Sequence, residues 1–222
     1  MMKGVNSKTV MNNEKISAVI FDLDGTLYDN KRLPLRLILA DPLNVLTLAA
    51  ERKARKAIMG IDYQNEAGVF NALFTKMCEV RKSLTIDKAR RWYHRRYMPA
   101  QIAVLSMYYT PRPCVAELLQ QLHEQGIRVI LYSDYDCATE KLMALNIDPS
   151  WFDAIVSAPE LGGLKPSKQS AERLLQRFSL SPDSVLMVGD RDDTDGATAR
   201  SVGMMFHNVK TQGWDSLLTM FG

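Results

Sequence analysis

The sequence predicts an α/β protein built on a parallel, doubly wound sheet, with a helical insert between its first two strands. Short apolar runs rich in β-branched residues alternate with segments of helical spacing, which is the pattern of strand–helix–strand units. Residues 31–110 contain no convincing strand. The 222 residues match one large domain with a modest insert, at roughly 150 residues per domain.

Five segments have the character of buried strands. The first, Ile16 to Phe21, is mostly apolar and stops at Asp-Leu-Asp-Gly, as expected for a strand buried on both faces. The others are Arg128 to Ser133, Ala154 to Ser157, Ser184 to Gly189 and Met204 to His207. Because ligands bind beyond the carboxyl ends of the strands in such sheets, we expect the functional residues there.

Helical spacing marks the segments between these strands. Val115 to Glu124 repeats apolar residues at helical intervals and stops before Gly126. Further helices are expected at Thr139 to Leu145, Lys168 to Phe178 and Gly196 to Val202. In the insert, Asp41 and Pro42 offer a cap and a first-turn proline for a helix to about Gly60, and two more helices are expected at Asn65 to Lys82 and Thr85 to Tyr97.

These elements divide the chain into three parts. We predict a polar N-terminal tail over residues 1–15, a core domain formed by residues 16–30 and 111–222, and a helical insert over residues 31–110. Pro111 and Pro113 mark the return from the insert to the core.

The composition is that of an ordinary globular protein. With 46% hydrophobic and 24% charged residues, it excludes collagen, coiled coil and disorder. The best candidate for a membrane helix, Leu35 to Ala50, is interrupted by polar residues and a proline. The first fifteen residues lack the apolar segment of a secretory signal, and the three cysteines have no disulfide or zinc spacing. We therefore predict a cytoplasmic protein without a membrane partner.

Positive charge is concentrated in the insert. The whole chain carries a net charge of only +3, but residues 31–110 hold 15 Lys and Arg against six Asp and Glu. We expect no nucleic-acid partner from so small a net charge. The two basic segments, residues 52–56 and 90–96, are either solvated helix faces or a means of attracting an anionic metabolite.

The sharpest motif is Asp22-Leu23-Asp24-Gly25-Thr26, directly after the first strand. Two carboxylates two residues apart can both project into the crevice above the sheet, where one can act as a nucleophile and the other as an acid and base. The alternative is a simple strand-ending turn, since Asp and Gly favour turns in any protein.

The ends of the other strands carry matching groups. Ser133 and Asp134 end the second strand, where a hydroxyl and turn N–H groups can hold a phosphate oxygen, although a helix cap is the plainer interpretation. Lys165 lies in a loop after the third strand, where a fixed cation can neutralise two anions or simply be solvated. Asp190 begins an acidic segment that ends at Asp195, and its oxygen ligands suit Mg²⁺.

Together these segments resemble the haloacid dehalogenase superfamily. All four motifs of that family occur in order, as VIFDLDGTLYD, VILYSD, LKPS and VLMVGDRDDTD, and the likeness extends from Ile16 onward. The resemblance implies a Rossmann-like core, and it identifies the insert as a C1 helical cap. Asp24 points to phosphoryl transfer, because dehalogenases of the family lack a carboxylate at that position.

The resemblance also implies a role for each residue. Asp22 would attack phosphorus and become a phosphoaspartate, while Asp24 would protonate the leaving oxygen and then activate water. Ser133, Asp134 and Lys165 would hold the phosphate. Magnesium would be bound by Asp22, the Asp24 backbone carbonyl and Asp190, with Asp195 holding a metal-bound water or orienting Lys165, and with Asp193 as the alternative to Asp195. Asp134 departs from the asparagine common in relatives, which leaves its role open.

We therefore expect a Mg²⁺-dependent phosphatase acting on a small phosphorylated metabolite. Tyr28 and Asn30 are the candidate specificity contacts, whereas Trp92, His94 and Tyr97 are more typical of the core or surface of the cap. Two alternatives stay open: a phosphomutase of the same superfamily, and a non-catalytic binding protein with this fold. The sequence specifies neither the metabolite nor the oligomeric state.

Overall fold

The computed structural model describes residues 16–222, and within them five parallel strands form one sheet in the order β3-β2-β1-β4-β5. The strands are β1 (Ala18–Phe21), β2 (Arg128–Ser133), β3 (Ala154–Ser157), β4 (Val185–Gly189) and β5 (Met205–Asn208). Every residue of β1 and β4 is buried, as expected for strands covered on both faces. The predicted parallel sheet is confirmed, and the polar tail lies outside the described residues.

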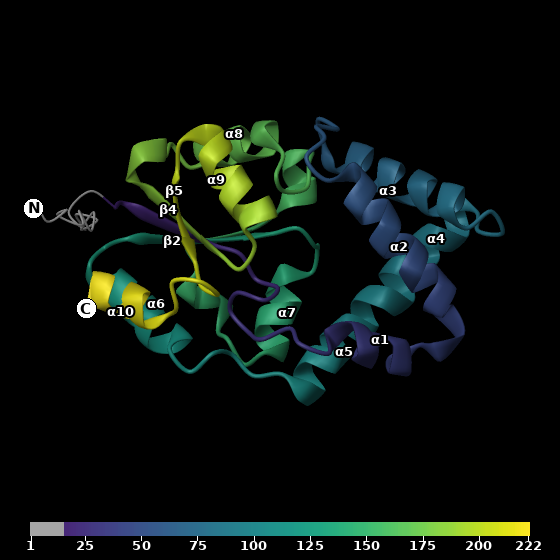
Figure 1. Ribbon diagram of the computed structural model, residues 1–222, viewed down its shortest axis with the longest axis horizontal. Coiled ribbons are helices and arrows are strands. Elements are labelled where there is room, and N and C mark those ends of the chain that lie inside the picture. Colours follow the sequence, from purple (N-terminus) through teal and green to yellow (C-terminus); the bar gives the residue numbers. More distant parts are fainter. Residues whose placement is uncertain (1–15) are drawn as a thin grey trace, which may run out of the picture.

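Helices cover both faces of this sheet. These helices are α6 (Val115–Glu124), α7 (Ala138–Ala144), α8 (Lys168–Arg177), α9 (Ala197–Val202) and α10 (Asp215–Phe221). Figure 1 shows α8 and α9 on one side of the strands and α6, α7 and α10 on the other. This arrangement is the doubly wound architecture that the sequence predicts. No sequence pattern predicted α10, a helix of seven residues whose first turn has no side-chain cap.

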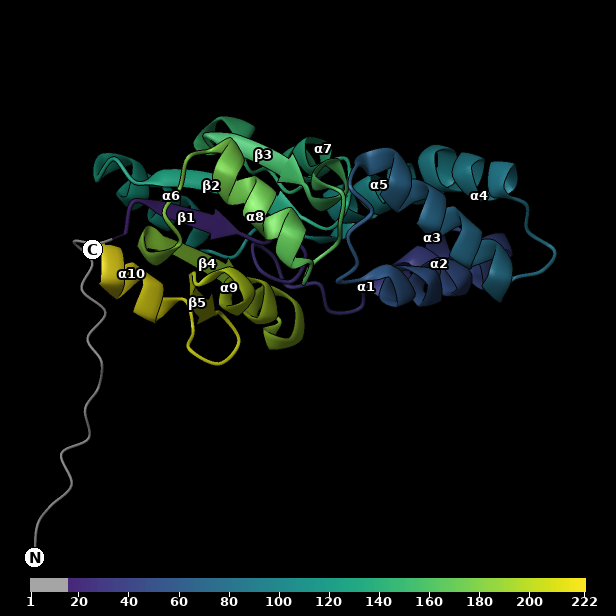
Figure 2. The same cartoon turned by 90° about the horizontal axis from the view of Figure 1, so that it is seen from above.

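Within the described residues, five further α-helices lie between β1 and α6 in the sequence. They are α1 (Leu33–Ala40), α2 (Val45–Ile58), α3 (Glu66–Val80), α4 (Ile86–Trp92) and α5 (Met98–Tyr108). They gather beyond the carboxyl ends of the strands, at one end of the molecule (Figure 2). The exact division between core and cap at residues 31 and 110 stays a prediction.

One helix start in this group is as predicted, and one helix end differs. Asp41 ends α1 through a bond from its N–H group to the carbonyl of Leu37, and it also precedes the 3-10 helix Pro42–Asn44, which begins with Pro42 and leads into α2. Its carboxylate accepts hydrogen bonds from Asn44 and Trp92, so it does not cap the following turn. At the other end, the helix expected to stop at Tyr97 continues through a wide turn into α5.

The two chain segments that join the helices to the sheet lie side by side. Tyr28 and Pro111 form an isolated antiparallel bridge, and the N–H group of Arg112 bonds to the carbonyl of Leu27 at 2.9 Å. The Arg112 side chain donates to the carbonyls of Gly25 and Thr26. The returning segment thereby supports the loop that follows β1.

Within residues 16–222, no single helix is long and apolar enough to cross a membrane. The segments Leu33–Ala40 and Pro42–Ile58 reach that length and composition only as a pair, and they are bent by 103° at the break between them. Cys78, Cys114 and Cys137 are all free, in agreement with the absence of a disulfide spacing in the sequence.

Candidate active site

Asp22 and Lys165 meet at the carboxyl edge of the sheet. The N–H group of Asp22 donates to Val188 in β4 at 2.9 Å, which continues the sheet pairing one residue past β1. The Nζ atom of Lys165 donates to Oδ1 of Asp22 at 2.6 Å, and Thr26 donates to Oδ2 at 2.8 Å. Both carboxylate oxygens of Asp22 are therefore oriented by neighbouring groups.

Lys165 also binds the second acidic segment. Its Nζ atom lies 2.7 Å from Oδ1 of Asp195, which is 2% exposed. Asp193, the alternative to Asp195, instead pairs with Arg191 at the surface, where 71% of its side chain is exposed. The geometry therefore favours Asp195 as the acid that orients Lys165.

Two glycines permit the close approach of these segments. Gly25 has a φ of +100°, and a Cβ atom there would lie 2.5 Å from a carboxylate oxygen of Asp190. A Cβ atom at Gly189 would lie 2.4 Å from Cβ of Asp195. Any larger residue at either position would push the acidic side chains apart.

Three of the carboxylates could hold a metal ion. Asp22, Asp190 and Asp195 each offer an oxygen within 4.8 Å of the others, and all three are buried. Carboxylate oxygens are the ligands that Mg²⁺ prefers, together with water and phosphate oxygens. The residues present therefore fit the cation that the sequence predicts.

Burial controls the protonation of Asp22. Desolvation raises the pKa of its carboxyl group from 3.8 to about 8, against the opposing effect of Lys165 and with further increases from Asp195 and Asp24. Burial alone would lower the pKa of Lys165, but the carboxylates of Asp195 and Asp22 outweigh it and keep the ammonium charged. A bound divalent cation would favour the ionised form of Asp22 that a nucleophile needs.

Asp24 is held on both of its carboxylate oxygens. Tyr28 donates its hydroxyl to Oδ1 at 2.5 Å, and Lys141 of α7 donates to Oδ2 at 2.9 Å. Asn30 donates to the backbone carbonyl of Asp24 at 3.2 Å. Of the two expected specificity contacts, Asn30 lines the cavity beside Asp22, whereas Tyr28 does not because its hydroxyl is turned to Asp24.

The second motif makes structural contacts. Ser133 is fully buried, and its hydroxyl accepts a hydrogen bond from the N–H group of Tyr135. The carboxylate of Asp134 accepts from the backbone N–H of Lys165 at 2.8 Å, and burial raises the pKa of Asp134. Asp134 therefore orients the Lys165 loop, and phosphate binding by Ser133 and Asp134 stays a prediction.

Several site residues were missed by the sequence analysis. Lys210 lies 2.5 Å from Oδ2 of Asp190, and its place just after the last strand was a usable signal. Lys141 is fully buried, three residues after the buried Ala138 and next to the buried Leu142. A lysine on the apolar side of a helix is the signal that could have found it. Arg55 follows Glu51 by four residues and pairs with it, and this spacing was a usable signal, whereas its contact with Asp134 joins distant parts of the chain.

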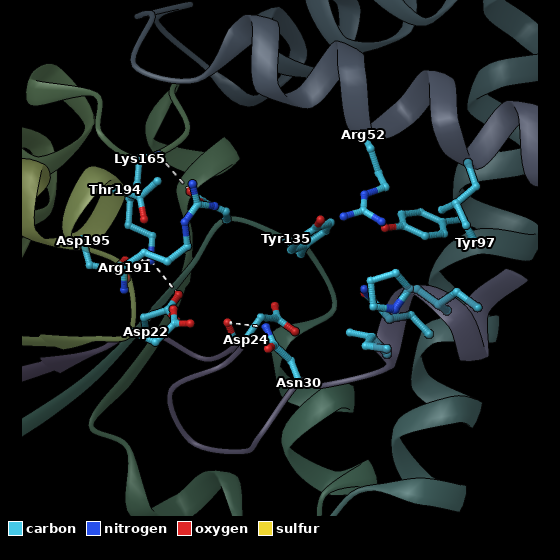
Figure 3. Close-up of a pocket in the computed structure, with 17 residues that line it drawn as sticks. Asp22, Asp24, Asn30, Arg52, Tyr97, Tyr135, Lys165, Arg191, Thr194 and Asp195 are labelled. Carbon is cyan, nitrogen blue, oxygen red and sulfur yellow. Dashed lines mark hydrogen bonds and ion pairs between the residues drawn. The ribbon is translucent and has the colours of Figure 1, made fainter. Parts of the chain in front are cut away.

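The reactive groups open onto a cavity of about 380 Å³ between the carboxyl ends of the strands and the helices of the insert, which is the expected cap. Figure 3 shows Arg52 and Tyr97 entering it from the cap side, opposite Asp22 and Lys165. Leu33, Pro34, Leu37 and Leu48 also line it. The cavity is therefore ionic at the strand ends and mixed at the cap.

A family model for haloacid dehalogenase-like hydrolases matches residues 16–203. The chain belongs to this family. The matched range includes all four strand ends that contribute acidic or basic groups to the cavity. The resemblance seen in the sequence is thus confirmed, as is the expectation of a hydrolase.

Two relatives similar in sequence and one similar in fold are named as phosphatases. The chain is 29% identical over 198 residues to a glyceraldehyde 3-phosphate phosphatase of Methanothermobacter thermautotrophicus, covering 85% of this chain and 83% of the relative. It is 26% identical over 178 residues to the pyrophosphatase PpaX of Bacillus cereus, covering 79% and 75%. Its fold is similar to that of a predicted phosphoglycolate phosphatase from Haemophilus somnus, with a TM-score of 0.61 and 23% identity over 89% of this chain and 86% of the other.

Proposed function

We propose that this family member is a Mg²⁺-dependent phosphatase that hydrolyses a small phosphomonoester through a phosphoaspartate on Asp22. The observation that carries the proposal is the position of Asp22, which is held by Lys165 and Thr26 and lines the same cavity as Asp24. A nucleophile and a proton donor on one short loop are what phosphoester cleavage requires.

Asp22, Asp24 and Lys165 have separate roles in the proposed reaction. Asp22 attacks phosphorus, and Asp24 donates a proton to the leaving oxygen and then takes one from the water that hydrolyses the phosphoaspartate. The ammonium group of Lys165, 2.6 Å from Asp22, reduces the repulsion between the carboxylate and the phosphate. Such fixed positive charge is effective because Lys165 is only 1% exposed, so water screens it little.

Asp22, Asp190 and the Asp24 backbone carbonyl would hold the Mg²⁺ ion, with Asp195 within reach. When bound, the cation supplies positive charge that stabilises the negative charge of the phosphoryl group. Lys141 and Lys210 each contact a carboxylate at the edge of the site. Lys165 lies beside Asp22, so Lys165 and the cation together would neutralise the phosphate.

The size of the cavity supports a small metabolite as substrate. A volume of about 380 Å³ is near the lower end of ordinary ligand pockets. The relative named glyceraldehyde 3-phosphate phosphatase supports the same class, a short phosphorylated carbon chain. A cytoplasmic location stays a prediction of the sequence.

The test is phosphate release from 4-nitrophenyl phosphate and from a panel of phosphorylated metabolites, with and without Mg²⁺. We expect release only with the cation, and none from the Asp22→Asn protein. An active Asp22→Asn protein would exclude the phosphoaspartate. Isomers of a sugar phosphate detected by NMR, without release of phosphate, would instead identify the phosphomutase that the sequence leaves open.

A further inference from the structure

A buried lysine lies behind Asp24, outside the motifs of the family. Lys141 of α7 is 0% exposed, and its Nζ atom donates to Oδ2 of Asp24 at 2.9 Å. The same ammonium lies 4.2 Å from the centre of the Tyr135 ring. Asp24 and Tyr135 line the cavity, but Lys141 does not. Lys141 therefore contacts Asp24 from the side that faces away from the cavity.

Burial of this lysine is costly unless its charge has a use. Removing an ammonium group from water is strongly unfavourable, even after the protein relaxes around it. The positions near Lys141 on α7, Ala138 and Leu142, are apolar and buried, so an uncharged side chain of similar length would pack there at lower cost. The hydrogen-bonded ion pair with Asp24, together with the face of the Tyr135 ring, offsets this cost.

Tyr28 completes the arrangement from the other side. Its hydroxyl donates to Oδ1 of Asp24 at 2.5 Å, and its ring is fixed by burial and by edge contact with Tyr109 at 5.4 Å. A carboxylate with a donor on each oxygen has one preferred plane. A carboxylate has about four lone-pair positions. Tyr28 and Lys141 occupy one on each oxygen of Asp24, so one lone pair on each oxygen stays free to hold the proton that Asp24 transfers.

We propose that Lys141, assisted by Tyr28, is a positioning residue that fixes Asp24 for proton transfer to the leaving oxygen. The proposal rests on the phosphatase function proposed above. As Asp22 forms its bond to phosphorus, the ester O–P bond breaks, its electron pair stays on the leaving oxygen, and the proton of Asp24 passes to that oxygen. Asp24 is left as a carboxylate beside the Lys141 ammonium, which keeps its own protons throughout.

The leaving group provides the test. Phenolate requires a proton as it leaves, whereas 4-nitrophenolate is stable without one, and kcat/KM reports only the steps up to departure of the leaving group. For Lys141→Met we expect kcat/KM on phenyl phosphate to fall by about 100-fold, the lower range for general acid catalysis. On 4-nitrophenyl phosphate it should fall by less than about threefold.

Three further variants separate positioning from stability. Leu142→Ala removes a buried neighbour on the same helix and should lower the melting temperature without changing the ratio of the two kcat/KM values. Asp24→Asn should reproduce the altered ratio, and adding Lys141→Met to it should have no further effect on the ratio. If Lys141→Met fails to fold, Tyr28→Phe, which removes one hydroxyl, is expected to shift the ratio in the same direction.

Two results would overturn the proposal. One is an equal fall in kcat/KM on both phosphates in Lys141→Met, which would show that the Lys141–Asp24 ion pair is only structural. The other is a further change of ratio when Lys141→Met is added to Asp24→Asn. Failure of the phosphatase function would look different, because the wild-type protein would then cleave neither phosphate in the presence of Mg²⁺.

Discussion

The Nζ atom of Lys165 lies 2.6 Å from Oδ1 of Asp22, although the two residues are 143 positions apart in the sequence. The same atom binds Asp195 at 2.7 Å. One buried ammonium thus joins the loop after β1 to the segment after β4. Removing Lys165 would leave two buried carboxylates without their counter-charge, whereas removing Asp22 would leave Lys165 paired with Asp195.

Replacement of the nucleophile should abolish catalysis without unfolding the protein. For Asp22→Asn we expect phosphate release to fall by at least about 1,000-fold, as for other enzymes that lose a nucleophile, because an amide cannot form the phosphoaspartate. Phosphate release and circular dichroism measure the two properties. Asp193→Asn is the matched control, since that carboxylate is exposed and paired with Arg191. Comparable losses in both variants would contradict the assignment.

Without Mg²⁺, stability should fall as the pH rises from about 4 to 8. Folded Asp22 has a raised pKa of about 8 against 3.8 ordinarily, so in this range the folded state binds a proton that the unfolded state has released. The free energy of unfolding then decreases with pH. Urea titrations at several pH values measure it, and Asp22→Asn should show a shallower decrease. An identical slope in both proteins would be evidence against the raised pKa.

Added Mg²⁺ should oppose the fall in stability with rising pH. The cation favours ionised Asp22, so it should raise the melting temperature more at pH 8 than at pH 5. Thermal melts with Mg²⁺ and with excess EDTA measure the difference. Equal increases at the two pH values would show that the cation binds elsewhere.

Asp190 and Lys210 should affect cation binding in opposite directions. Asp190→Asn removes a carboxylate ligand, and the Mg²⁺ concentration for half-maximal activity should rise by about tenfold or more. Lys210→Met removes a positive charge 2.5 Å from the same carboxylate, so that concentration should fall. Titration of activity with MgCl₂ provides both values, and changes of the same sign would contradict the proposed cation site.

Arg55 should stabilise the contact between cap and core. Its guanidinium binds Glu51 at 2.6 Å and the carbonyl of Asp134 at 3.0 Å. Arg55→Met leaves Glu51 buried without its partner, so we expect a loss of about 3 to 5 kcal/mol in unfolding free energy. Adding Glu51→Leu should restore much of it. Urea denaturation of the four proteins in this cycle measures the coupling, and strictly additive losses would count against it.

Most of the core and its reactive groups followed from local patterns. Asp22 and Asp190 come directly after short apolar runs, and parallel strands bring their carboxyl ends to one edge. Helix boundaries in the cap followed less well. Asp41 and Pro42 do begin the helical turn that leads into α2, but the Asp41 side chain does not cap it, because its carboxylate accepts from the side chains of Asn44 and Trp92. Such competition for a side chain is invisible to a local pattern.

By itself, the sequence determined the alternation of strands and helices and the acid pair of Asp22 and Asp24, because spacing and chain order encode them. Only the tertiary structure decided which charges meet. Asp134 orients the Lys165 loop, and Lys141 reaches Asp24 from a helix 117 positions away. Ion pairs between distant segments depend on how helices pack against the sheet, and no short stretch of sequence carries that information.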